Sequence, residues 1–450
     1  MSTQKDAIYN ARELGTPKML VLGFQHMFAM FGATVLVPAL TGLSVSATLL
    51  FAGLGTLLFH LLTKGAVPAF LGSSFAFLSG YFATAAACGE LGLDNFSAYA
   101  GVGVACAGLL YIILSALFKI FGASKVMKFF PPIVTGPIII SIGLTLSSSA
   151  IANCQANWWI AIVAILVVIV CNIWGKGMIK IVPILIGVIA SYAIAAVTGN
   201  VDWSGVIAAD WIGLPVAYEN TAFSLFGGCN VSLLITTIIT VMPIAIATII
   251  EHIGDISAIS STVGKNYIAS PGLHRTLLGD GLATMMAALF GAPANTTYGE
   301  NTGVLALSKV YDPKVIRIAA VLAVIFSFSP KFAAIVSAMP VATMGGISLV
   351  LYGMISAVGV RNIVENKVDF TKSRNVIIAA LIMVLSIGIN YSAAGAIVFT
   401  IGSITISLSG LAVAALVGII LNAILPGKDY EFGKDLQGDT AVNFGSRNDG

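Results

Sequence analysis

Charged side chains are scarce in this sequence. Only 9% of the 450 residues are Asp, Glu, Lys or Arg, whereas 58% belong to the hydrophobic set. Soluble domains carry roughly 25% charged and roughly 45–50% apolar residues, so this chain has too few charges to solvate a globule of its mass. The composition therefore predicts a polytopic membrane protein.

Cysteine and clustered positive charge are also sparse. The five cysteines contain no C-x-x-C pair, so they predict neither a disulfide framework nor a zinc site, and we expect no metal and no cofactor. The formal net charge is only +3 and the basic residues are scattered, which argues against nucleic acid as a partner. Residues 1–17 are polar, and the first apolar run is long enough to stay in the membrane, so we expect no cleavable signal peptide.

Long apolar runs, by contrast, recur along the whole chain. A membrane-spanning helix needs about 20 apolar residues, and the chain contains seven plus seven candidate segments. They lie at residues 19–40, 45–63, 73–88, 98–122, 130–150, 157–175, 180–199, 231–254, 273–291, 297–309, 313–329, 340–358, 375–392 and 409–425. The predicted fold class is all-α, a polytopic membrane protein with fourteen transmembrane segments, of which 73–88 and 297–309 are too short to span as full helices.

The basic residues predict the orientation of these segments, because cytoplasmic loops are enriched in Lys and Arg. If the N-terminus lies inside, 21 of the 22 basic residues fall in inner loops or tails, and only Lys331 falls outside. We therefore expect both termini to be cytoplasmic. Residues 1–17 would form a cytoplasmic tail, and residues 426–450, which have no apolar period, a disordered cytoplasmic tail.

Seven segments per half is an odd number, so the two halves must enter the membrane from opposite sides, as in the inverted repeats of secondary transporters. Weak traces agree with this: Pro131–Gly136 followed by Gly143 resembles Pro340–Gly346 followed by Gly353. The two short segments, each preceded by a Pro- and Gly-containing stretch, also occupy the third place in their halves. Such a pair points to a binding site near the middle of the membrane.

Four of the 19 acidic residues lie at membrane depth rather than in tails or loops: Glu251, Asp255, Asp280 and Glu300. A carboxylate there costs at least ~2.5 kcal/mol on insertion scales. Glu251 and Asp255 are one helical turn apart, so their mutual repulsion disfavours simultaneous ionisation and suits coupling to a proton. Asp255, near the inner end of its predicted helix, also fits a solvated terminal residue, and Asp280 fits the packing of a Gly-rich helix start.

Glu300 lies in the polar stretch Asn295–Gly303. Gly299 allows a ligand to approach the backbone, and a half-helix that begins there offers free N–H donors. Carboxylate acceptors beside backbone donors complement a flat, uncharged heterocycle that alternates N–H with C=O, such as a pyrimidinedione. The alternative is that Glu300 bonds its own unwound backbone. Phe75 and Tyr298 are candidates for stacking on a planar ring, or for packing alone.

Two histidines also lie at membrane depth. We expect His26 to brace neighbouring helices through hydrogen bonds. His252 follows Glu251 directly and points about 100° away from it, so we expect a packing or interface role.

The sequence resembles the nucleobase-ascorbate transporter family, also called nucleobase:cation symporters, and within it the bacterial uracil permeases. The resemblance covers residues 15 to 425. Five strings carry it: Gln25–Pro38, Pro68–Phe77, Glu251–Gly254, Pro271–Arg275 and Asn295–Gly303.

The resemblance implies a 7+7 inverted repeat in which segments 3 and 10 are each a short strand plus a half-helix, divided into a substrate-binding core domain and a gate domain. The implied boundaries are 18–150 (core segments 1–4 and the start of the gate, segment 5), 151–228 (gate segments 6–7 and an outer loop), 229–312 (core segments 8–10 and the start of 11) and 313–425 (the remainder of core segment 11 and gate segments 12–14).

The resemblance also implies the site residues. Glu251 and Glu300 would accept the ring N–H groups of a base, and Ala33 would lie close to the ring. The backbone N–H groups of Phe75 and Gly299, with Tyr298 nearby, would donate to its carbonyls. Proton coupling would involve Glu251 and Asp255, although some uracil permeases carry His where this chain has Asp255, so this second carboxylate would act by another route.

The implied function is a proton-coupled secondary active importer, a symporter, of uracil that works by alternating access in the bacterial inner membrane, and not an enzyme. The family often forms homodimers through the gate domain. One alternative is a permease for xanthine, uric acid, or both uracil and xanthine, and another is an uncoupled channel or anion exchanger on the same fold. An intramembrane aspartyl protease using Asp255 and Asp280 is excluded, because the Tyr-Asp and Gly-x-Gly-Asp contexts of such enzymes are missing.

Overall fold

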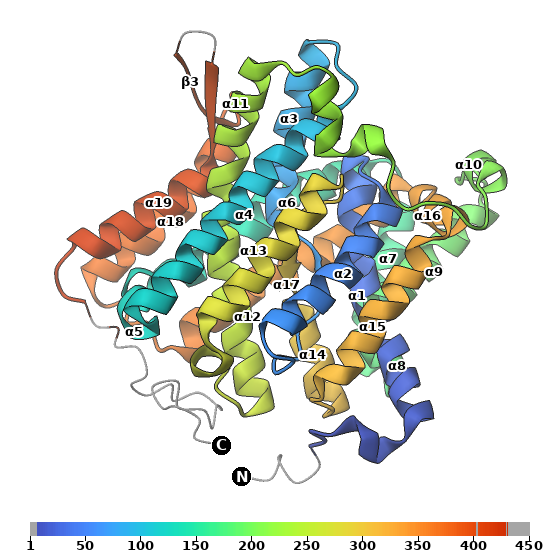
Figure 1. The fold of residues 1–450 in the computed structure, drawn as a ribbon, viewed down its shortest axis with the longest axis horizontal. Helices are drawn as coiled ribbons and strands as arrows, with labels where there is room; N and C mark the ends of the chain where they lie inside the picture. Colours follow the sequence, from blue (N-terminus) through green and yellow to red (C-terminus); the bar gives the residue numbers. More distant parts are fainter. Residues whose placement is uncertain (1–6, 402–403, 429, 431–450) are drawn as a thin grey trace.

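Helices make up most of the molecule (Figure 1). The computed structural model describes residues 7–401, 404–428 and 430, so most of the predicted C-terminal tail, 426–450, lies outside the described residues. The longer helices are α1 (Thr16–Thr41), α2 (Val45–Leu62), α3 (Leu78–Glu90), α4 (Phe96–Phe121), α6 (Pro132–Gln155), α7 (Trp158–Trp174), α9 (Pro183–Val197), α11 (Val231–Val241), α12 (Ala245–Val263), α13 (Leu273–Leu289), α14 (Gly299–Ser308), α15 (Pro313–Ser327), α17 (Val341–Glu365), α18 (Ser373–Asn390) and α19 (Gly410–Ile424).

Short elements complete the chain. They are the helices α5 (Ala123–Val126), α8 (Met178–Ile181), α10 (Ser204–Ala208) and α16 (Pro330–Ser337), several 3-10 turns, a short π-helix (Ile268–Gly272), and four strands, β1 (Leu71–Ser73), β2 (Asn295–Thr297), β3 (Ala396–Ile401) and β4 (Ile404–Ser409). Side-chain caps explain several helix starts: Ser44, Asn157 and Asn230 each accept a hydrogen bond from a backbone N–H of the helix that follows.

By length and composition, seven helices of the described residues could cross a membrane, or eight if α15 and α16, bent by 91°, form one span. The apolar helices α7, α9 and α19 are shorter. This architecture supports a multi-pass membrane protein, while the count of fourteen segments stays a prediction.

The helices pack in two groups. In one group α4 packs on α13, α13 on α2, α2 on α15, and α15 on α1; in the other, α6 packs on α17 and α18, α17 on α7, α7 on α9, and α18 on α19. The groups meet where α12 contacts α6 and α19, and where α1 contacts α9. Each group thus combines helices from both halves of the sequence.

The predicted segment 231–254 differs from the structure. Its first part is α11, a 3-10 turn with Pro243 follows, and α12 then continues to Val263. Asp255 therefore lies two turns before the end of its helix and is 5% exposed. The alternative that Asp255 is a solvated residue at a helix end is wrong, because the polar residues after it extend the helix instead of ending it.

A β-hairpin that the apolar runs do not predict lies between the last two helices. β3 and β4 pair antiparallel, with Ala396 opposite Ser409, and β4 contacts α11 and α19. The hairpin projects beyond the helices at the upper left of Figure 1. The alternation of β-branched and polar residues in Ile404–Ser409 is typical of a strand, but it is invisible to a search for long apolar runs.

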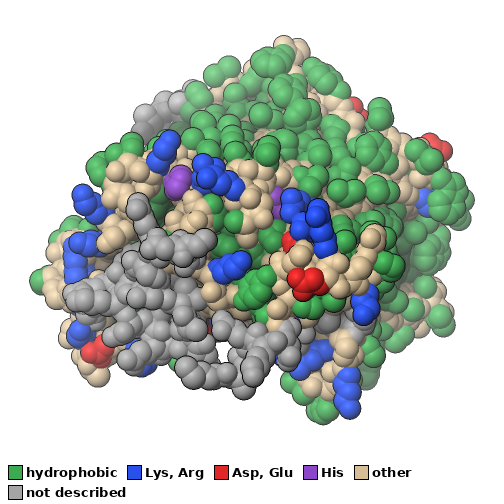
Figure 2. Space-filling model, turned by 60° about the horizontal axis from the view of Figure 1, so that its bottom comes forward, with side chains coloured by type: hydrophobic (Ala, Val, Ile, Leu, Met, Phe, Trp, Pro, Cys, Tyr) green, Lys and Arg blue, Asp and Glu red, His purple; other side chains and the backbone are tan. Residues whose placement is uncertain are grey.

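Basic residues gather at one end of the molecule. Figure 1 places α5 and α8, which carry Lys125 and Lys180, at the lower end, and α16, which carries Lys331, at the upper right. Figure 2 shows Lys and Arg side chains on the face of that lower end. The uneven distribution of basic residues predicted from the sequence is thus present in the folded molecule. That this end faces the cytoplasm stays a prediction.

The N-terminal segment is attached to the same end. Ile8 forms a parallel bridge with Val310, just after α14. The N–H of Ala11 donates to Asp312 Oδ2 at 2.8 Å. Part of the predicted tail 1–17 is therefore ordered against the core of the protein.

Glycines permit the closest helix contact. Gly143 of α6 faces the backbone carbonyl of Tyr352 on α17, where a Cβ would collide with it. Gly353, its counterpart in the predicted repeat, is exposed and has open space around its Cα. Small residues let membrane helices approach at the backbone level, so the two similar glycines play different structural roles.

We predict that Gly143→Leu destabilises the protein by about 1–3 kcal/mol or more, because the added side chain must separate α6 from α17. Thermal unfolding in detergent measures this loss. Gly353→Leu, the matched control, should unfold at the wild-type temperature, and equal stability of both variants would contradict the close packing.

Candidate functional site

Two short strands from distant parts of the chain meet inside the molecule. β1 and β2 pair antiparallel, with Gly72 opposite Thr296. Each strand precedes a short helix: β1 leads through a 3-10 turn into α3, and β2 leads into α14. The two interrupted segments of the sequence thus form one structural unit, with the strand and short helix that we expected in each.

Hydrogen bonds that involve side chains connect these strands to the surrounding helices. The N–H of Leu71 donates to Thr56 Oγ1 at 2.9 Å, and Ser73 Oγ donates to the carbonyl of Thr34 at 2.8 Å. On the other strand, Thr284 Oγ1 donates to the carbonyl of Asn295 at 2.8 Å. Irregular backbone at membrane depth is tolerated only where protein groups satisfy it, so these polar residues hold the site together.

Tyr298 braces the same unit. Its ring lies against Gly72, where no Cβ would fit, and its hydroxyl donates to the carbonyl of Ser73 at 3.0 Å. The side chain is 3% exposed. The structure thus places Tyr298 across the strand pair, with its polar end bound to β1.

The starts of both short helices lie beside this crossing. Phe75 is the first residue of the 3-10 turn before α3, and Gly299 is the first residue of α14. The first N–H groups of a helix have no partner within that helix, so these positions suit donation to a ligand. The ring of Phe75 is buried and packs edge-on against Tyr352 of α17, with centroids 5.7 Å apart. Ala33 of α1 is buried next to Thr34, which binds β1.

The carboxylate of Asp255, on α12, lies next to the start of α14. Its Oδ2 accepts a hydrogen bond from Thr297 Oγ1 at 3.2 Å, and a Cβ at Gly299 would lie 3.1 Å from its Oδ1. The carboxylate therefore lies at the N-terminus of α14, where the helix dipole favours negative charge. Glu251, one turn earlier, is partly buried on the same helix. The backbone of Glu300 belongs to α14, and its side chain lies outside the described ones.

A second carboxylate is paired with a histidine that the sequence analysis assigned to packing. Asp280 Oδ2 lies 3.0 Å from His252 Nδ1, and both side chains are fully buried. Asp280 lies well inside α13, which begins at Leu273, so it is not at a helix start as expected. One feature of the sequence could have predicted this pair: both residues are polar groups at the predicted membrane depth, and a buried carboxylate needs a partner.

His26 of α1 is fully buried and lies next to Asn301 of α14. Asn301 Nδ2 in turn donates to the carbonyl of Pro68 at 2.6 Å, which ties α14 to the stretch before β1. Among the described residues, no group of three or more His, Cys, Asp or Glu side chains is placed to hold a metal ion.

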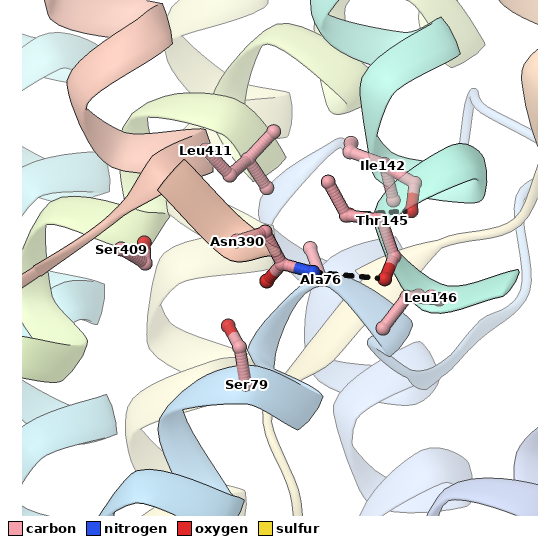
Figure 3. A pocket seen from close by; sticks show the side chains of 8 residues that line it. All are labelled: Ala76, Ser79, Ile142, Thr145, Leu146, Asn390, Ser409 and Leu411. Atoms are coloured by element: carbon pink, nitrogen blue, oxygen red, sulfur yellow. Dashed lines mark hydrogen bonds between the residues drawn. The ribbon is translucent and has the colours of Figure 1, made fainter. Parts of the chain in front are cut away.

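A small cavity opens beside the start of α3. It measures about 20 Å³, enough for about one water molecule. Figure 3 shows that Ser79 of α3 lies across this cavity from Thr145 of α6 and Asn390 of α18. Asn390 Nδ2 donates to the carbonyl of Thr145 at 3.2 Å. The cavity has both polar and apolar lining residues, lies between α3, α6 and α18, and includes Ala76, the residue after Phe75.

Paired strands at the starts of two short helices, within a bundle of apolar helices, define a membrane transporter fold. The transmembrane domain of a cyanobacterial bicarbonate transporter, BicA, has a similar fold: the TM-score is 0.62 at 17% identity, and the match covers 93% of this chain and 99% of that one. The murine Solute Carrier 26 family member A9 anion transporter in the inward-facing state gives a TM-score of 0.60 at 10% identity, over 93% and 68%. These likenesses establish the fold alone.

Sequence comparisons identify the family. The model Xan_ur_permease, described as a permease family, matches residues 17–395. The uracil permease of Bacillus caldolyticus is 41% identical over 91% of this chain and 92% of its own length; that of Bacillus subtilis is 38% identical over 94% and 96%, and that of Escherichia coli K12 is 37% identical over 90% of each. The chain belongs to this permease family, the nucleobase-ascorbate transporters, and is a transporter and not an enzyme. The resemblance read from the sequence is confirmed.

We predict that Tyr298→Phe lowers the stability by about 1 kcal/mol, because the variant loses the buried hydrogen bond to Ser73 and keeps the ring on Gly72. Thermal unfolding in detergent measures the effect. Tyr218→Phe, at an exposed hydroxyl bonded to the carbonyl of Phe223, is the control, since water can replace that bond. Wild-type stability of Tyr298→Phe would show that its hydroxyl does not brace the strands.

Proposed function

We propose that the protein imports uracil across the bacterial inner membrane as a proton-coupled symporter that works by alternating access. The observation that carries this proposal is the 37–41% identity to uracil permeases over at least 90% of both chains. The strand crossing and the membrane-buried carboxylates beside it support the proposal, because they supply the groups that a nucleobase requires.

Uracil is flat and uncharged, and it presents N–H and C=O groups in alternation. Glu251 and Glu300 accept its N–H groups, and the backbone N–H groups of Phe75 and Gly299 donate to its carbonyls. The starts of the 3-10 turn and of α14 at these two positions support this assignment. Ala33 allows the ring to approach α1, and Tyr298 holds the strand pair beneath it.

The proposed transport cycle moves a core domain against a gate domain. The core comprises segments 1–4 and 8–11, the gate segments 5–7 and 12–14, and the two halves of the chain are inverted repeats with both termini in the cytoplasm. The separate packing of α1, α2, α4, α13 and α15 from α6, α7, α9, α17, α18 and α19 supports this division. The contact between Phe75 and Tyr352 crosses it beside the proposed site. Two copies associate through their gate domains.

Glu251 and Asp255 supply the proton coupling in this proposal. Two carboxylates one helical turn apart repel each other when both are ionised. Asp255 lies at the start of α14, where the proposed substrate binds, so occupation of the site changes the environment of the carboxylate. A proton that accompanies uracil neutralises one charge while the site crosses the membrane.

Two other functions compete with this one. A purine carrier for xanthine or uric acid would share the fold and the backbone donors. An uncoupled channel or anion exchanger is the second, since solved anion transporters share the fold. Carboxylates at the site disfavour an anionic substrate, and the relatives with 37–41% identity are named uracil permeases.

Transport in proteoliposomes tests the proposed function. We expect labelled uracil to accumulate when an inwardly directed proton gradient is imposed, unlabelled uracil to compete, xanthine to compete weakly, and a protonophore to abolish accumulation. Strong competition by xanthine without competition by uracil would show that the substrate is a purine and not uracil. Uptake that is insensitive to the protonophore would contradict proton symport and support a channel or an exchanger.

Gly299 offers a test of the site itself. We predict that Gly299→Ala weakens uracil binding by about tenfold, or about 1.4 kcal/mol, because its Cβ would lie 3.1 Å from Asp255 Oδ1 and displace either the carboxylate or α14. Gly303→Ala is the matched control on the same helix, where a Cβ meets open space. Calorimetric titration with uracil measures both variants, and equal affinities would remove the start of α14 from the site.

A further inference from the structure

Four buried side chains form a continuous polar chain next to the proposed site. Asp255 Oδ2 lies 3.2 Å from Thr297 Oγ1, Thr297 Oγ1 lies 3.2 Å from His252 Nδ1, and His252 Nδ1 lies 3.0 Å from Asp280 Oδ2. Three elements contribute: α12 carries Asp255 and His252, β2 carries Thr297, and α13 carries Asp280. The chain thus connects the carboxylate at the start of α14 to a second carboxylate deeper in the bundle.

Burial makes this arrangement costly unless the charges compensate each other. His252 and Asp280 are fully buried, Thr297 is 1% exposed and Asp255 is 5% exposed. Isolated charges in such surroundings are strongly disfavoured, so buried carboxylates are protonated or paired. The structure offers Asp280 one basic partner at hydrogen-bonding distance among the described residues, and that partner is His252.

The surroundings of His252 contain few other polar groups. Glu251 precedes it on α12, and Tyr111 of α4 lies close enough to interact with Asp280, Glu251 and Asp255, while its hydroxyl donates to Thr248 Oγ1 at 2.7 Å. From α2, the ring of Phe59 packs edge-on against the imidazole, 6.3 Å away. His252 Nε2 has no hydrogen-bond partner among the described groups. Nδ1 is therefore the ring nitrogen through which His252 can exchange a proton with the described groups.

The threonine hydroxyl can bridge these groups in two ways, because it has one proton and can both donate and accept. In the first arrangement Asp255 is ionised and accepts the Thr297 proton, while the oxygen of Thr297 accepts a proton from an imidazolium at His252 Nδ1. In the second, the proton has left Nδ1 for the threonine oxygen and the hydroxyl proton has moved to Asp255 Oδ2, which leaves a carboxylic acid and a neutral imidazole. One N–H bond and one O–H bond break, two O–H bonds form, and the net charge stays the same.

We propose that His252 and Asp280 form a proton store for the carrier, and that Thr297 passes a proton between this store and Asp255. Asp280 is ionised in both arrangements: it is paired with the imidazolium in the first, and the loss of this pairing makes the second arrangement the less stable one, so the proton returns to the store. The store allows Asp255 to change its charge as the site fills and empties while water has no access to it. This inference rests on the proposed proton-coupled transport.

The substitution Thr297→Val removes the proposed proton relay and keeps the fold. Valine is β-branched and favours strands, so β2 is retained, while the one oxygen that bridges Asp255 and His252 is lost. Thr297→Ser restores that oxygen. Thr63→Val is the matched control: Thr63 is a fully buried threonine at the end of α2 whose hydroxyl donates to the carbonyls of Phe59 and His60.

The test compares two measurements on the full chain in proteoliposomes. Counterflow exchange of labelled for unlabelled uracil requires movement of the loaded site but no net proton transfer, whereas uracil-driven proton uptake, followed with an internal pH dye, requires both. We expect Thr297→Val to keep exchange within about twofold of wild type while proton uptake falls by about tenfold or more. Thr297→Ser should recover proton uptake, and Thr63→Val should match wild type in both measurements. Unchanged proton uptake in Thr297→Val, or an equal loss of both activities, would overturn the relay.

A second measurement does not depend on transport. The chain has four histidines, so the ¹⁵N imidazole signal of His252 can be assigned by its loss in His252→Gln. We expect the ¹⁵N chemical shift of Nδ1 to differ from wild type in Thr297→Val and in Asp280→Asn, because each variant removes one of the two polar groups that lie 3.2 and 3.0 Å from that nitrogen. A signal that is the same in all three proteins would refute the store. If both variants change this signal but the wild type shows no uracil-driven proton uptake, the proposed symport is refuted instead.

Discussion

Unsatisfied backbone groups at membrane depth are the constraint on which the structure depends. β1 and β2 interrupt the helical pattern at the point where two short helices begin, so their N–H and C=O groups need partners that helices supply internally. They find them in each other and in side chains of two neighbouring helices, Thr56 of α2 and Thr284 of α13. The same interruption creates helix starts inside the bundle, and these provide the donors of the proposed site.

Charge placement follows from the same physics. A chain with so few charges keeps most of them at the ends of its helices, where water solvates them. The exceptions lie together around β2: Asp255 beside Gly299, and Asp280 against His252. Because burial makes an unpaired charge costly, each of these groups is connected to another polar group, and a connected set of this kind can hold and move a proton.

Local pattern accounted for much of the fold. Apolar runs located most of the long helices, because burial in lipid requires continuous apolar sequence, and the Pro- and Gly-containing stretches before the two short segments located the strands. The hairpin β3–β4 was missed because its signal is an alternation with a period of two. The end of α12 was misplaced because polar residues after Asp255 resemble a helix terminus, whereas they pack inside the protein. The first error overlooks a local pattern, whereas the second depends on what packs beside the segment.

The sequence by itself determined that the chain belongs in a membrane, that it resembles nucleobase transporters, and which carboxylates lie at membrane depth. These conclusions follow from composition and from strings of neighbouring residues. Only the tertiary structure decided which of these groups meet. Thr297 lies 42 residues from Asp255 in sequence and bonds to it, and Asp280 is paired with His252 rather than placed at a helix start. Such contacts between distant positions depend on how α12, α13 and β2 pack, and no local pattern encodes that packing.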